Sequence, residues 1–166
     1  MTSSSPPLLS LSLEQTRALQ TLFRRYKGRG RSALLPLLHE VQAITGWVDA
    51  PTARAIAHTL GIHDIDVHNV LEFYGLFYNR PVGKRIIRVC RDITCTVAGN
   101  DAIIQVLAKR LGVDAHEGGT SADGQFTLEL HPCLGHCEVA PFLMVNDQPV
   151  ELATPDMVAQ WLEDET

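Results

Sequence analysis

Four cysteines, arranged as two close pairs, constrain the fold of this chain more than any other feature. Cys90 pairs with Cys95 and Cys133 pairs with Cys137, and these are all the thiols in the 166-residue sequence. Two pairs so far apart in the sequence can act at one site only if the fold brings their segments together. Four soft thiolates in two short segments are the donors that a tetrahedral thiolate metal site requires.

The spacing within each pair bears on which metal they hold. Four residues separate Cys90 from Cys95, and three separate Cys133 from Cys137. The wider loop can wrap two sulfide-bridged irons and favours a [2Fe–2S] cluster, whose usual ligands are four thiolates. Zinc accepts the same ligands, so a zinc-stabilised interaction module stays open. A thiol–disulfide oxidoreductase is a further alternative, although neither pair has the Cys-x2-Cys spacing of that class.

Around the cysteines the sequence resembles a known family. The motifs are Cys-x4-Cys, then Cys-Leu-Gly-x-Cys, followed by Ala140-Pro141 and an apolar segment ending in Val145-Asn146-Asp147. They are similar to the thioredoxin-like [2Fe–2S] ferredoxin subunit of respiratory complex I, a module also found in soluble NAD-dependent formate dehydrogenases and hydrogenases. The upstream segments LLPLLHEVQAITGWV and VLEFYGLFYNRPVGK resemble the same family, so the likeness extends over residues 13–162.

The resemblance implies a fold of the α+β class, with an N-terminal helical bundle followed by a thioredoxin-like domain with a mixed sheet. It also implies that one [2Fe–2S] cluster is bound by four ligands, Cys90, Cys95, Cys133 and Cys137. The cluster would exchange single electrons with the FMN of a separate NADH-oxidising flavoprotein subunit within a larger oxidoreductase complex. We expect that complex to be complex I, an NADH–quinone oxidoreductase, because the match runs on without interruption. The alternative is the equivalent subunit of a soluble formate dehydrogenase or hydrogenase.

Residues 11–83 have the pattern of a helical bundle. Ser12 to Gln15 form a capping box, and apolar residues follow at helical spacing up to Tyr26. Three more helices are expected between cap residues and helix-ending residues: Ser32 to Gly46, Asp49 to Gly61, and Asp64 to Leu71.

An aromatic stretch and a change of pattern divide the chain. The stretch FYGLFY, residues 73–78, is expected to pack the helical part against the next domain. Pro81-Val82-Gly83 marks the expected domain boundary. Residues 1–10 are rich in Ser and Pro and are expected to be disordered. The predicted organisation is therefore a disordered 1–10, a helical domain over 11–83 and a cluster domain over 84–166.

From Lys84 the hydrophobic period changes from helical to alternating. Residues 85–90 and 126–131 have the pattern of strands, and each leads into a cysteine pair. If these strands are neighbours, the two pairs converge at one rim of the sheet. The remaining elements are expected as a helix over 97–111 with Gly112 as its cap, a loop over 118–124, a hairpin over 142–151, and a last helix from Pro155 with Met157, Val158, Trp161 and Leu162 facing inward.

Charge argues against nucleic-acid binding. The net charge of −5 is uneven, since residues 1–83 hold 8 Lys and Arg against 6 Asp and Glu, whereas residues 84–166 hold 6 against 13. An acidic domain does not attract phosphates. The basic run over 24–31 is expected to be solvated cations at a helix C-terminus. No Gly-rich dinucleotide fingerprint and no P-loop occurs in the sequence, so no active site of its own is expected.

Residues near the cysteines have two interpretations. His131 and His136 flank the second pair and Arg91 follows Cys90. The two histidines could donate hydrogen bonds to cluster sulfur and tune its potential, and Arg91 could offset the negative charge of the cluster. Each could equally be an ordinary surface residue.

No direct membrane insertion is expected. No apolar run reaches membrane length, and the first residues lack the features of a secretory signal. The expected location is cytoplasmic, peripheral to the inner membrane where the chain is part of a complex. In a reducing compartment, paired cysteines indicate metal ligands.

Overall fold

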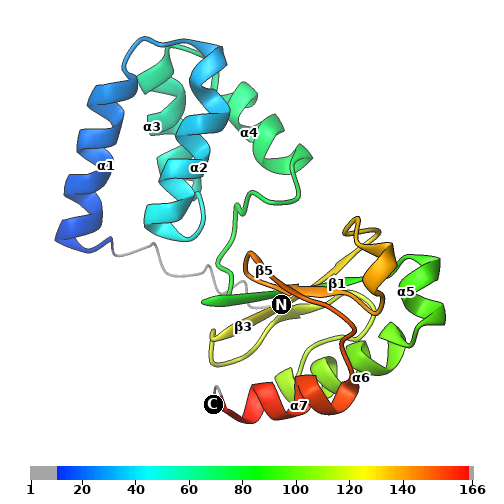
Figure 1. Ribbon diagram of the computed structural model, residues 1–166. Coiled ribbons are helices and arrows are strands. Elements are labelled where there is room, and N and C mark those ends of the chain that lie inside the picture. Colours follow the sequence, from blue (N-terminus) through cyan, green and yellow to red (C-terminus); the bar gives the residue numbers. More distant parts are fainter. Residues whose placement is uncertain (1–10, 165–166) are drawn as a thin grey trace, which may run out of the picture. The chain divides into compact units, whose positions relative to one another are not determined.

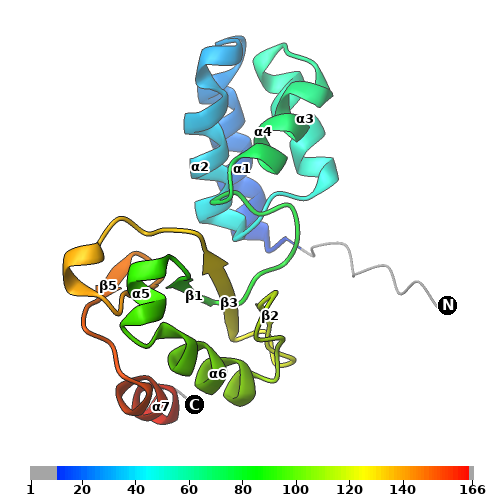
Figure 2. The same ribbon diagram turned by 90° about the vertical axis from the view of Figure 1, so that its right-hand side faces the viewer.

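The structure is a computed structural model that describes residues 11–164. The expectation of disorder over residues 1–10 falls outside the described residues. The chain divides into two compact units that meet between Pro81 and Val82. Within the described residues, the first unit contains helices only, and the second contains a five-stranded sheet with further helices (Figures 1 and 2). This confirms the α+β class. None of the helices in residues 11–164 is both long and apolar enough to cross a membrane.

The helical unit contains four α-helices joined by short turns. The helix α1 begins at the predicted capping box, where Ser12 Oγ accepts from the Gln15 N–H at 3.1 Å and Gln15 Oε1 accepts from the Ser12 N–H at 3.0 Å. Gly46 and Gly61 end the second and third helices in the left-handed conformation, as predicted. The bounds are α1 Leu13–Tyr26, α2 Leu34–Thr45, α3 Ala50–Leu60 and α4 Asp64–Phe73.

Two of the predicted caps are wrong. The chain enters α2 through a 3-10 turn, Arg31–Ala33, so Ser32 already lies in a helical turn and Ala33 occupies the cap position. Asp64 is the first helical residue of α4, and His63 precedes it as the cap. The carboxylate of Asp66 accepts from the His63 N–H at 3.3 Å, so the acidic residue that closes this helix start lies inside the first turn.

The aromatic stretch is split between core and surface. Phe77 and Tyr78 are buried, and the Phe77 ring lies 4.7 Å from that of His39 on α2. Phe73 is 81% exposed and Tyr74 is 44% exposed. Phe77 thus belongs to the core of the helical unit itself, and the packing of this stretch against the next domain stays a prediction. The inward face of α4 is taken by Val67 and Leu71, and a residue two positions after Leu71 points to the opposite side of the helix.

The second unit is built on a mixed sheet whose strands run in the order β2-β3-β1-β4-β5. Strands β1 and β3 are parallel, and the other pairs are antiparallel. Both views show α6 and α7 side by side along one face of the sheet (Figures 1 and 2). The bounds are β1 Arg85–Cys90, α5 Ile93–Val97, α6 Asn100–Leu111, β2 Gly119–Thr120, β3 Phe126–His131, β4 Leu143–Val145, β5 Gln148–Val150 and α7 Pro155–Asp164.

Three details of this unit differ from the sequence prediction. The helix expected over 97–111 begins only at Asn100, as α6, and a separate short helix, α5, precedes it, because Gly99 at φ 106° interrupts the α-helical path between the two. The expected loop contains the two-residue strand β2. Met157 is 50% exposed although Val158 and Leu162 on the same helix are buried, because the apolar face that α7 turns to the sheet is too narrow to include it.

Candidate metal centre

The pairing of two parallel strands brings both cysteine segments to one edge of the sheet. Cys90 is the last residue of β1 and lies opposite His131, the last residue of β3. Cys95 follows within α5, and Cys133 lies two residues beyond β3. Cys137 begins a 3-10 turn, Cys137–Val139. Figures 1 and 2 show α5 and this turn at the same end of the sheet.

Electrostatic interactions link the four thiols in a chain. Burial raises the pKa of the Cys95 thiol, and Cys90 and Cys137 raise it further. Desolvation raises the pKa of the Cys137 thiol, and the neighbouring Cys133 raises it further. Since such interactions act at short range, Cys90 and Cys137 influence Cys95 from nearby, and Cys133 does the same for Cys137. All four are free thiols.

The two pairs differ in exposure. Cys90 and Cys95 are buried at 2% and 1%, whereas Cys133 and Cys137 are exposed. Within residues 11–164, no three His, Cys, Asp or Glu side chains are grouped closely enough to hold one metal ion. A [2Fe–2S] cluster makes a different demand, because each of its two irons takes two protein ligands. Two neighbouring thiol pairs, one inside and one at the surface, fit that demand.

Apolar residues and backbone N–H groups surround the thiols. Phe142 packs against Cys90 and Cys95, and the His136 ring stacks on that of Phe142 with centroids 4.5 Å apart. The backbone N–H of Phe142 donates to Cys95, and that of Gly135 donates to Cys133 Sγ at 3.4 Å. Donors aimed at thiolate sulfur stabilise its negative charge, and the Phe142 N–H therefore offsets part of the burial that raises the pKa of Cys95.

Two of the flanking residues have partners other than the cysteines. His131 Nε2 lies 3.3 Å from Glu129 Oε2, and Arg91 Nη1 donates to the carbonyl of His116 at 3.0 Å. His136 reaches the site by its stacking on Phe142 rather than by a hydrogen bond to sulfur.

Asn100 and Phe142 also belong to the site, although no motif in the sequence marks them as site residues. Asn100 is fully buried, and its Nδ2 donates to the carbonyls of Cys90 at 2.6 Å and Phe142 at 3.3 Å. The only signal in the sequence was a polar residue directly after the glycine that interrupts the predicted helix. Nothing local indicated its burial.

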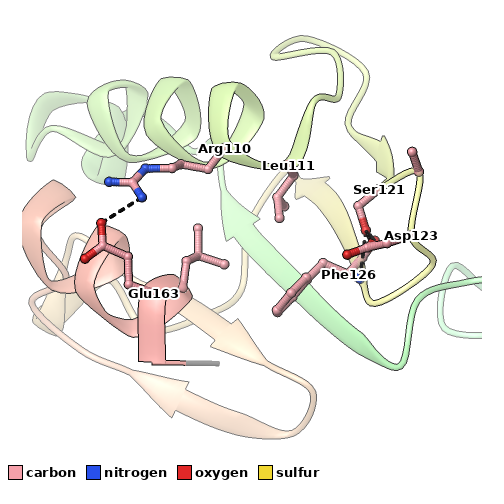
Figure 3. A pocket seen from close by; sticks show the side chains of 8 residues that line it. Arg110, Leu111, Ser121, Asp123, Phe126 and Glu163 are labelled. Carbon is pink, nitrogen blue, oxygen red and sulfur yellow. Dashed lines mark hydrogen bonds and ion pairs between the residues drawn. The ribbon is translucent and has the colours of Figure 1, made fainter. Parts of the chain in front are cut away.

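An open hollow of about 580 Å³ lies away from the cysteines, between the C-terminal ends of α6 and α7 and the start of β3. Figure 3 shows that its polar side chains are paired with one another: Arg110 with Glu163, and Ser121 with Asp123. Its lining contains none of the cysteines, so the thiol site and this hollow are separate features of the unit.

Residues 19–166 match the family model of the thioredoxin-like [2Fe-2S] ferredoxin. The chain therefore belongs to this family. Among individual proteins, it is 41% identical over 133 residues to an NADH-quinone oxidoreductase subunit of Pseudomonas aeruginosa, with 80% of this chain and 79% of that protein covered. It is 34% identical over 153 residues to the protein of the same name in Escherichia coli, with coverage of 92% and 90%.

A solved structure shows the same fold. An NAD+-reducing [NiFe]-hydrogenase in the H2-reduced state superposes with a TM-score of 0.72 at 19% identity, over 82% of this chain and 22% of that one. The chain thus spans about a fifth of the hydrogenase chain it matches, and at this identity the likeness concerns the fold alone. The family carries a [2Fe–2S] cluster, which confirms the cofactor predicted from the sequence. The assignment of the four cysteines as its ligands stays a prediction.

Proposed function

We propose that the chain is an electron-transfer subunit of an NADH–quinone oxidoreductase complex, respiratory complex I. Its four cysteines, Cys90, Cys95, Cys133 and Cys137, hold one [2Fe–2S] cluster that exchanges single electrons with the FMN of a partner NADH-oxidising subunit. The observation that carries this proposal is the parallel pairing of β1 with β3, which ends both strands at one edge and so leads both cysteine segments away from that edge.

The residues of the chain position and insulate the redox group. When bound, the cluster supplies one-electron chemistry that can divide a two-electron hydride reaction into single steps. Cys90 and Cys95 hold it from the buried side, where Phe142 excludes water. Cys133 and Cys137 hold it from the exposed side, which is where a redox partner has access.

Metal analysis of the anaerobically purified chain tests the cofactor and its ligands. We expect about two irons and two sulfides per chain, and a visible absorption band that dithionite bleaches. Replacement of any one of the four cysteines by serine should lower the iron content strongly, whereas Ser121→Ala, in the hollow away from the thiols, should not. Stoichiometric zinc without visible absorption would instead identify the zinc-stabilised module.

Exposed apolar side chains near the thiols suit a permanent protein partner. Ile93 and Val97 lie four residues apart on α5, on either side of Cys95, and are 76% and 83% exposed. In the helical unit, Phe73 and Leu76 are 81% and 53% exposed. Exposed apolar side chains that lie next to one another are characteristic of interaction surfaces. We infer that both groups contact the flavoprotein subunit.

Reconstitution with the flavoprotein subunit of the same complex tests the partner. The isolated chain should reduce no acceptor with NADH, and adding the flavoprotein should restore NADH-dependent reduction of the cluster. Val97→Asp and Phe73→Asp should weaken this complex, whereas Leu13→Asp should not, although Leu13 is 81% exposed on α1. Oxidation of NADH by the isolated chain would overturn the proposal. Co-purification with a formate dehydrogenase or hydrogenase subunit would assign a different parent complex.

A further inference from the structure

The amide of Asn100 is the most deeply buried polar side chain near the thiols. Asn100 is the first residue of α6, directly after Gly99, and its exposed fraction is 0%. Taking an amide out of water is unfavourable unless hydrogen bonds replace those to water. The atoms that Asn100 contacts therefore indicate why the fold keeps an amide at this position.

The Nδ2 group joins the two segments that carry the cysteine pairs. It donates to the carbonyl of Cys90 at 2.6 Å and to that of Phe142 at 3.3 Å. The same Phe142 carbonyl accepts from the Cys90 N–H at 3.4 Å, and the Phe142 N–H donates to Cys95. One side chain thus fixes the first cysteine against the residue whose backbone donates to the second.

The other end of the amide has no partner. Asn100 Oδ1 is buried, and no group among the described residues donates to it. A buried acceptor without a donor lowers stability, so a side chain kept only to stabilise the fold would be expected to satisfy both ends. The orientation of this amide is set by the two carbonyls that its NH2 group contacts.

We propose that Asn100 is a positioning residue for the cluster. It holds the backbone of Cys90 and that of Phe142 together, and this keeps the N–H of Phe142 directed at Cys95. The inference rests on the proposed ligand role of the cysteines. Hydrogen bonds to the sulfurs of an iron–sulfur cluster are among the factors that set its reduction potential. They stabilise the more negative, reduced form, so losing the alignment lowers the potential.

The test compares Asn100→Leu and Asn100→Ala in the full chain with wild type. Leucine keeps the branched shape without the donor, and alanine removes both. Redox titration followed by EPR should give a lower potential in both variants, together with changed g values. Ser121→Ala is the matched control, because Ser121 is also buried and its hydroxyl bonds the backbone of Phe126 away from the thiols. It should leave the potential and the spectrum unchanged.

The inference would be overturned if both Asn100 variants had the reduction potential and g values of wild type. It would also be overturned if Ser121→Ala shifted the reduction potential by the same amount as the Asn100 variants. A variant that takes up no iron has no potential to measure. In that case we compare the alkylation rates of Cys90 and Cys95 in the metal-free variant with those in the metal-free wild-type chain. They should rise relative to those of metal-free wild type while the helical unit keeps its circular dichroism, and unchanged rates contradict the role. If the wild-type chain itself binds no cluster, the proposed function is wrong. That outcome differs from a wild-type cluster whose properties do not depend on Asn100, which contradicts only the inference about Asn100.

Discussion

Tyr26 and Glu40 couple the first two helices through ionisable groups. The Tyr26 hydroxyl donates to Glu40 Oε1 at 2.6 Å, and Arg25 forms an ion pair with the same carboxylate. The hydrogen bond from Tyr26 holds the pKa of Glu40 below its ordinary value of 4.5. The same bond raises the pKa of Tyr26 above its ordinary 10.0.

Tyr26→Phe should therefore lower the melting temperature in a pH-dependent way. The lowered pKa of Glu40 means that its contribution is complete above pH 4.5 and is lost as pH falls through the folded-state value. The raised pKa of Tyr26 means that its contribution is complete below pH 10.0 and is lost as pH rises through the folded-state value. Thermal unfolding followed by circular dichroism should show the largest difference from wild type between these limits. A difference independent of pH would contradict the coupling.

At the scale of elements, the approach of β1 to β3 depends on Gly83. A Cβ at this position would lie 2.4 Å from the backbone carbonyl carbon of Phe126, which cannot move aside without displacing β3. The Gly83 N–H also donates to Thr127 Oγ1 at 2.6 Å. Glycine is therefore required here for close approach rather than for a left-handed conformation.

Gly83→Ala should destabilise the second unit by about 1–3 kcal/mol, the usual range for forcing extra atoms into a packed region. Urea unfolding followed by the visible absorption of the bound cluster measures this effect. Gly75→Ala is the matched control, because no atom lies within 4 Å of its added Cβ, and its effect should stay within about 0.5 kcal/mol. Equal midpoints for the two variants would show that β1 has room to shift.

At the scale of the whole molecule, the buried apolar residues fall into sequence-local groups. The core of the helical unit draws its buried residues from Leu19 to Phe77. The buried residues of the sheet core and of the thiol cluster lie between Ile87 and Leu162. We infer from this separation that the parts proposed as domains, 11–83 and 84–166, can fold independently.

Cys133→Ser in the full chain tests that independence. The variant should lose most of its iron, while the far-UV circular dichroism of the helical unit persists, because the buried core of that unit includes no residue of the thiol cluster. Limited proteolysis should leave a fragment covering residues 11–75 intact. Complete unfolding of the N-terminal half would mean that both units form one cooperative structure.

The sequence by itself determined the features that depend on near neighbours along the chain. The capping box at Ser12, the glycine ends of α2 and α3, the strand Arg85–Cys90 and the final hairpin were all predicted and are present. Each depends on backbone preferences and contacts within about one helical turn or one hairpin. The spacing of the cysteines likewise indicated a thiolate site, because ligand chemistry is a property of the side chains themselves.

Only the tertiary structure decided which distant residues meet. Cys90 lies opposite His131 because β1 pairs with β3 in parallel, and that register sets where the two thiol pairs come together. The burial of Asn100 is likewise settled by its contact with Phe142, a residue far along the chain. Local pattern says which residues are apolar or polar, but burial depends on which surfaces pack against them. Packing between distant segments is a property of the whole fold.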